Sequence, residues 1–195
     1  MKKDTVIESP LTRFVVRKRT LFSLLVPLIF VFFARPNVAW LAIGLVLVIA
    51  GEATRIWAAG CISKNRELAC KGPFAHVRNP LYVGSLLIGV GYCFMSGLWW
   101  SFLITAGFYY WFYYGTIVSE EEHLRSVLGE PYERYTQAVP RLMPRLSPWP
   151  CDGPGFLWNR VWYNREYESI VGVSLFTLAF VVIWLLPNHQ LFSGL

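Results

Sequence analysis

The chain has 195 residues, and its 55% hydrophobic content against 15% charged residues excludes an ordinary soluble domain. Its net charge of +6 does not indicate a nucleic-acid partner, because the basic residues flank apolar runs, where they orient a protein against anionic lipid. We therefore expect an integral membrane protein that forms a single domain over 1–195.

Five apolar runs predict an all-α, polytopic membrane protein of about five transmembrane helices. A basic arm at 1–19 precedes them and is expected at the cytoplasmic headgroups. The apolar runs are 21–34, 38–57, 81–97, 98–118 and 170–186. The domain then divides into four spans within 21–118, a cytoplasmic catalytic segment at 119–168 and a fifth span at 169–187.

The basic residues fall on one side of this arrangement. With the N-terminus in the cytoplasm, all of the 18 Lys and Arg residues except Arg35 lie in segments on the cytoplasmic side. This asymmetry predicts a cytoplasmic N-terminus and a C-terminus on the other side. It also places the segments around 72–82 and 120–145 on the same face, where they can meet.

A polar, turn-rich segment at 72–82 separates two of the apolar runs. Gly72-Pro73 breaks a helix arriving from upstream, and Pro80 is suited to the first turn of a new one. Backbone groups between the two prolines lack helical partners, so they are candidates for binding a ligand. The alternative is an interfacial loop in which His76 and Arg78 contact lipid phosphates.

The segment after the fourth run is rich in charge. Ser119 and Glu122 have the spacing of a capping box, which predicts a short helix over 120–128, and Glu121 with Arg125 is spaced for an ion pair. Glycines at 84, 89 and 91 predict close contact between the third span and its neighbours.

The four cysteines, Cys61, Cys70, Cys93 and Cys151, form no Cys-x-x-Cys pair and no ligand spacing with a histidine. We therefore expect no metal site, and we expect each cysteine to be a small buried side chain that is neither bridged nor catalytic.

Four blocks in order resemble the isoprenylcysteine carboxyl methyltransferase and phospholipid methyltransferase superfamily of integral membrane enzymes. They are Gly-Pro-Phe-Ala-His-Val-Arg-Asn-Pro-Leu-Tyr at 72–82, Glu-Glu at 120–121, Leu-Gly-Glu-Pro-Tyr-Glu-Arg-Tyr at 128–135 and Val-Pro-Arg-Leu-Met-Pro at 139–144. Asn79 stands where the eukaryotic prenylcysteine enzymes have His, and a fifth span follows the last block.

The resemblance implies an enzyme that transfers a methyl group from S-adenosylmethionine to a lipid or lipid-linked small-molecule acceptor, with a catalytic pocket at the cytoplasmic face. The implied catalytic residues are Arg78, Arg141 and His76. The implied cofactor-binding residues are Gly72, Pro73, Phe74, His76, Val77, Arg78, Asn79, Tyr82, Glu120 and Glu121. Carboxylates would neutralise the cofactor ammonium, and the roles of Arg78 and Arg141 toward cofactor and substrate are interchangeable. For an amine acceptor, His76, His123 or a glutamate would serve as the base.

Two other classes of protein share some of these features. An NADPH-dependent membrane reductase of the sterol-reductase kind resembles the same C-terminal blocks, although such proteins are usually larger. A non-catalytic lipid-binding membrane protein would use the blocks only as interfacial anchors.

The charge asymmetry yields a test of orientation. A reporter fused at Met1 should lie in the cytoplasm and one fused after Leu195 should lie outside it, because Lys and Arg are retained on the cytoplasmic side. Paired fusions to an alkaline phosphatase and a fluorescent protein measure this. A cytoplasmic C-terminus would contradict the five-span arrangement.

Overall fold

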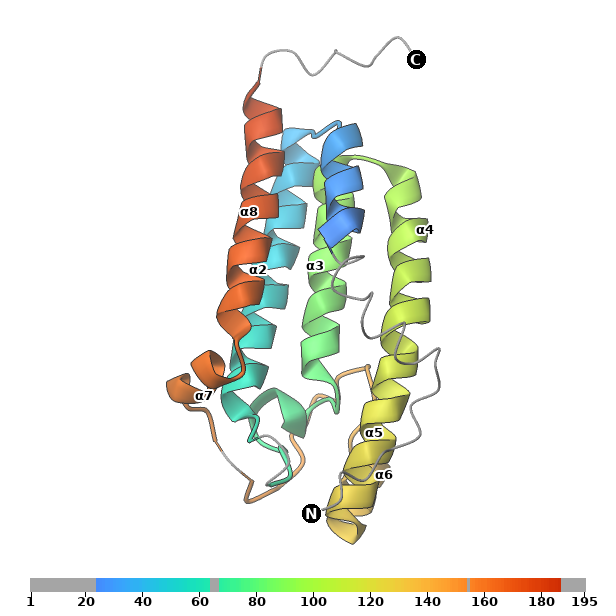
Figure 1. The fold of residues 1–195 in the computed structure, drawn as a ribbon, viewed down its shortest axis with the longest axis vertical. Coiled ribbons are helices and arrows are strands. Elements are labelled where there is room, and N and C mark those ends of the chain that lie inside the picture. The colour runs from blue at the N-terminus through green and yellow to red at the C-terminus, as the bar shows by residue number, and fades with distance from the viewer. Residues whose placement is uncertain (1–23, 64–66, 154, 187–195) are drawn as a thin grey trace, which may run out of the picture.

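The computed structural model describes residues 24–63, 67–153 and 155–186, which form helices joined by turns and irregular segments. The basic arm at 1–19, the start of the first span and His189 lie outside these residues. The long helices run roughly alongside one another, and the short helices α6 at Glu130–Ala138 and α7 at Trp158–Tyr163 lie at one end of them (Figure 1).

The helices follow the predicted apolar runs closely. A first helix covers Leu24–Phe33, α2 covers Val38–Cys61, α3 covers Pro80–Ser96 and α8 covers Glu166–Leu185. Within the described residues, α2 and α8 are long and apolar enough to cross a membrane by themselves, whereas Leu24–Phe33 and α3 are shorter. Asn37 begins α2 by accepting a hydrogen bond from the backbone N–H of Ala39 at 2.9 Å.

The fourth predicted span is part of a longer rod, so the predicted break near 118 is wrong. The helix α4 at Trp99–Phe108 continues through a π-helical turn, η2, at Tyr109–Tyr114 into α5 at Gly115–Leu128. Ser119 therefore lies inside a helix and does not cap one. The backbone first breaks at Gly129, whose φ of 60° is left-handed, because no proline or cap interrupts the chain before it. The helix α6 at Glu130–Ala138 follows.

Close packing of α2 on α3 depends on glycines, as predicted. A Cβ added at Gly84 would lie 2.6 Å from the Gly51 carbonyl oxygen, and one at Gly91 would lie 2.8 Å from that of Gly44. Neither separation is compatible with a side chain, so glycine is what allows the two backbones to approach.

A polar network ties α8 to the core. Arg55 of α2 forms an ion pair with the buried Glu166 at 2.7 Å, and it donates to Ser169 at 3.1 Å and to Ser85 of α3 at 2.5 Å. The helix α8 thus begins at Glu166, before the apolar run predicted at 170, and its first residue is held by this pair. Glu52 accepts from Ser169 at 3.2 Å. Charged groups at this depth are costly unless paired, and here they connect three helices.

The polar segments gather at one end of the rods. The turns at 34–37 and 97–98 occupy the opposite end, where the backbone N–H of Arg35 donates to the Ser96 carbonyl at 2.7 Å. The short 3-10 helix η1 at Gly72–Ala75, α6 and α7 at Trp158–Tyr163 all lie at the first end (Figure 1). The prediction that 72–82 and 120–145 share a face is confirmed, and which side of the membrane this is stays a prediction.

The cysteine prediction is wrong for two of the four residues. Cys70 and Cys151 form a disulfide, with Cα atoms 6.0 Å apart, whereas Cys61 and Cys93 are free and buried. The bridged residues are separated by 81 positions and meet because the segments after α2 and after α6 pack together around Tyr132 and Tyr135. This contact cannot be predicted from the spacing of the cysteines along the chain.

The disulfide gives a direct test. Alkylation of the protein denatured without reductant should modify Cys61 and Cys93 alone, because a bridged sulfur does not react with the reagent. Mass spectrometry of the peptides reads this out, and prior reduction should expose Cys70 and Cys151 as a control. Modification of all four cysteines without reductant would contradict the bridge.

Candidate active site

The 72–79 segment is held in place by hydrogen bonds from the later blocks. The carbonyl of Phe74 accepts from the Tyr135 hydroxyl at 2.8 Å, that of Ala75 from the Trp149 backbone N–H at 2.9 Å, and that of His76 from the Arg145 backbone N–H at 2.9 Å. These three carbonyls, predicted to be without helical partners, thus have protein donors. These hydrogen bonds hold the 72–79 segment in place beside the candidate site.

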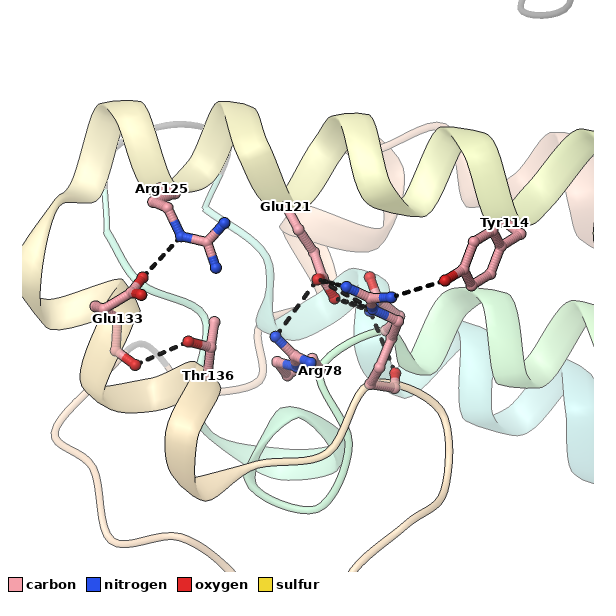
Figure 2. Close-up of polar contacts among 8 residues, drawn as sticks. Arg78, Tyr114, Glu121, Arg125, Glu133 and Thr136 are labelled. Carbon is pink, nitrogen blue, oxygen red and sulfur yellow. Dashed lines mark hydrogen bonds and ion pairs between the residues drawn. The ribbon is translucent and has the colours of Figure 1, made fainter.

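A buried carboxylate lies where the blocks meet. Glu121 of α5 is only 3% exposed. Arg141 donates to it through Nη2 at 2.8 Å and Nε at 3.1 Å, Asn79 donates through Nδ2 at 2.8 Å, and Arg78 Nη1 lies 3.4 Å away. Figure 2 shows Glu121 directed from α5 toward Arg78. A carboxylate away from water requires such compensation, and this one receives it from three positions of two other blocks.

The cluster contains two guanidinium groups and one carboxylate, so it has an excess of positive charge. Arg78 Nε is buried and has no hydrogen-bond partner. Arg141 is about one-third exposed, donates to the Tyr114 hydroxyl at 3.4 Å and lies with its Cζ 5.8 Å from the Tyr114 ring centre. Hydrogen bonds to Glu121 raise the pKa of Arg141 above its ordinary value. Donor capacity and charge at this point suit an anionic group.

His76 is oriented by a backbone carbonyl. Its Nδ1 lies 2.8 Å from the Arg145 carbonyl oxygen, which can only accept, so Nδ1 carries the hydrogen. In the neutral ring Nε2 then remains as the proton acceptor. Among the other predicted bases, His123 is exposed on α5.

The two tyrosines of α6 are not proton acceptors at ordinary pH. Burial, with the nearby Glu121 as a second cause, raises the pKa of Tyr132 to about 12. Burial also raises the pKa of Tyr135, whose hydroxyl donates to the Phe74 carbonyl. Both phenols therefore stay protonated, and Tyr135 serves to hold the 72–79 segment.

The structure gathers most of the predicted site residues, but not all of them. Within the 72–79 segment, the side chains of Pro73, Phe74 and Val77 are buried. Gly72 has a φ of 61°, and a Cβ there would lie 2.9 Å from Trp57 Nε1. Tyr82 packs edge-on against Tyr113 at 5.4 Å rather than against the carboxylate. Glu120 is exposed, in contrast to Glu121. The predicted pair of Glu121 with Arg125 is wrong, because Arg125 binds Glu133 at 2.7 Å (Figure 2).

Three contributors were not predicted from the sequence. Tyr114 contacts Arg141, and Arg145 and Trp149 bind the 72–79 segment through their backbone N–H groups. The two backbone contacts cannot be inferred from residue type, and Tyr114 is one of several neighbouring aromatic residues at 108–114. The described residues also include a cavity of about 440 Å³ whose lining residues are not those predicted for the site; they are Glu67, Leu68, Cys70, Leu128, Pro131, Cys151, Asp152 and Gly153. Within the described ranges no three His, Cys, Asp or Glu side chains are grouped to hold a metal ion.

Comparison with known proteins confirms the resemblance inferred from the blocks. Residues 39–131, slightly less than half of the chain, match the phospholipid methyltransferase family. This match and the two membrane-length apolar helices of the described residues both support an integral membrane protein.

Two curated proteins are similar to the chain over about half its length. Protein-S-isoprenylcysteine O-methyltransferase of Schizosaccharomyces pombe is 31% identical over 100 residues, which are 51% of this chain and 42% of that enzyme. The cobalt-zinc-cadmium resistance protein CzcN of Cupriavidus metallidurans is 33% identical over 112 residues, which are 55% of this chain and 50% of that protein. The chain thus spans half or less of the length of these relatives. No solved structure matches it significantly.

The hydroxyl of Tyr135 should make a measurable contribution to the stability of the fold. Tyr135→Phe removes the donor to the buried Phe74 carbonyl, and leaving such a group unpaired costs about 1–3 kcal/mol. Thermal unfolding in detergent should show a clearly lower melting temperature for Tyr135→Phe than for the parent. Tyr132→Phe leaves that bond in place and is the matched control. Equal melting temperatures for Tyr135→Phe and the parent would contradict the assignment.

Proposed function

We propose that the chain transfers a methyl group from S-adenosylmethionine to a lipid or isoprenoid-linked acceptor at the cytoplasmic face of the membrane. The observation that carries this proposal is the Glu121 cluster, in which residues from the 72–82, 120–121 and 139–144 blocks converge on one buried carboxylate. Family membership of 39–131 supports the class of reaction.

The donor set fits the charged end of the cofactor. S-adenosylmethionine carries a carboxylate and an ammonium, and the cluster offers guanidinium groups for the first and a carboxylate for the second. The unpartnered Arg78 Nε is the donor that would bind the cofactor carboxylate. In this proposal Glu121 contacts the ammonium, and the backbone of 72–77 borders the adenosine.

The contacts of Glu121 also define a competing role. Its two oxygens already accept from Asn79 and Arg141, so part of its effect would be to position the arginines rather than to touch the ammonium. The two roles predict different dependence on the chemical groups of the cofactor, which makes them separable.

The cofactor would supply an electrophilic methyl group, and the residues around it would bind and orient both reactants and limit access of water. Arg141, whose guanidinium is one-third exposed beside Tyr114, is placed to bind an anionic group of the acceptor. His76 Nε2 would accept the proton of an amine acceptor, whereas a carboxylate acceptor would need no base. An acceptor held in the membrane would reach this end of the helices without leaving the lipid.

The proposed cofactor contact predicts a specific pattern of binding. Glu121→Gln should weaken S-adenosylhomocysteine binding by about ten- to a hundredfold, as expected for loss of a hydrogen bond to a charged group worth about 1.5–3 kcal/mol. Calorimetric titration of the solubilised protein measures this. Glu122→Gln changes an exposed neighbouring carboxylate and should leave the affinity unchanged.

Two cofactor analogues divide the possible roles of Glu121. An analogue that keeps the amine but lacks the carboxylate should still lose affinity if Glu121 contacts the ammonium, and should be unaffected if Glu121 only positions arginines. 5′-Methylthioadenosine lacks both groups and should bind parent and variant alike. Failure of the parent to bind S-adenosylhomocysteine would sink the proposed function. Bound NADPH or bound lipid alone would instead support the reductase or the non-catalytic alternative.

A further inference from the structure

Side chains spaced by four residues along the rod of α4, η2 and α5 are buried or contact α3 and the segment that precedes it. Thr105 contacts Cys93 at 3.1 Å, the Tyr109 hydroxyl donates to the Tyr82 carbonyl at 3.3 Å, and the Tyr113 ring packs on that of Tyr82. Ser101 and Ile117 are fully buried, and Glu121 meets Asn79. We call this set the stripe; its six members are spaced by four positions and are Ser101, Thr105, Tyr109, Tyr113, Ile117 and Glu121.

A regular α-helix cannot keep such a stripe on one face. Each residue turns the helix by about 100°, so a step of four overshoots a full turn by about 40°. From Thr105 to Glu121 the accumulated rotation would be about 160°, which would direct Glu121 away from the blocks. The contacts show that it does not point away.

The π-helical turn at Tyr109–Tyr114 removes this discrepancy. A π turn accommodates about one residue more than an α turn, which cancels about 100° of rotation. The remaining offset of about 60° lies within the width of a single helix face. Tyr110 and Trp111, which lie off the stripe, are 69% and 68% exposed.

We propose that the π turn is the positioning element of the site: it rotates α5 so that Glu121 faces Arg78, Asn79 and Arg141. This deepens the proposed function, since it rests on Glu121 as the site carboxylate, but the register argument depends on contacts alone. Its test therefore needs no cofactor.

The proposal makes an asymmetric prediction for changes in length. Deletion of Trp111 shortens the step from Tyr109 to Tyr113 to three residues, so an ordinary α-helix then keeps the stripe and Glu121 keeps its partners. Insertion of one alanine after Trp111 lengthens that step to five and turns Glu121 away. Trp111→Ala changes the side chain without changing the length and is the matched control.

The readout is the drop in melting temperature that Glu121→Gln causes in each background, measured in detergent. The drop should be the same in the parent, the Trp111 deletion and Trp111→Ala, and largely abolished in the insertion. If the insertion variant does not fold while the deletion variant does, this outcome also supports the proposal, because it shows the same asymmetry. The proposal is overturned if the deletion loses the drop or does not fold, if Trp111→Ala loses it, or if the insertion keeps it. If the parent protein does not bind the cofactor, the proposed function is refuted, but the conclusion about the π turn is unaffected.

Discussion

Burial of the Glu121 carboxylate is the constraint on which the functional end of the molecule depends. A lone carboxylate with 3% exposure would be strongly unfavourable, and donors from Asn79, Arg141 and Arg78 offset that cost. Because these donors come from the loop before α3 and the segment after α6, one charge holds distant parts of the chain together. Through two donors of Arg141 it also orients that guanidinium group.

The membrane helices provide the rigid frame for this cluster. Glycines bring α2 and α3 into backbone contact, and Arg55 joins α2, α3 and α8 through Ser85 and Glu166. Ser85 lies one turn beyond Tyr82, so the network that anchors α8 acts on the same part of α3 that borders the site. The π turn then supplies the rotation that this frame requires of α5.

The segment after α6 acts as a strap over the 72–79 loop. Backbone N–H groups of Arg145 and Trp149 bind carbonyls of the loop, and the bridge from Cys151 to Cys70 closes the strap against the chain that leaves α2. Hydrogen bonds to these backbone carbonyls hold the loop in place, as the proposed methyl transfer would require of the residues that orient its reactants.

Local pattern was enough to predict most of the helical runs, the close approach of α2 and α3, the resemblance to membrane methyltransferases and the meeting of 72–82 with the charged segment. Each of these follows from hydrophobicity, small residues, motif order or the side on which Lys and Arg lie. Backbone hydrogen bonds, such as the one from the Trp149 N–H to the Ala75 carbonyl, could not be predicted in this way, because they do not depend on the type of side chain.

Only the tertiary structure decided which partners those residues take. The local capping pattern at Ser119 does not start a helix, because η2 continues into α5 without a break. Glu121 pairs with Arg78 and Arg141 rather than with the nearby Arg125, since a buried carboxylate needs several donors while Arg125 lies at the surface beside Glu133. Cys70 finds Cys151 for the same reason: spacing along the chain describes neighbours on one helix, while burial selects residues that folding brings together from far apart.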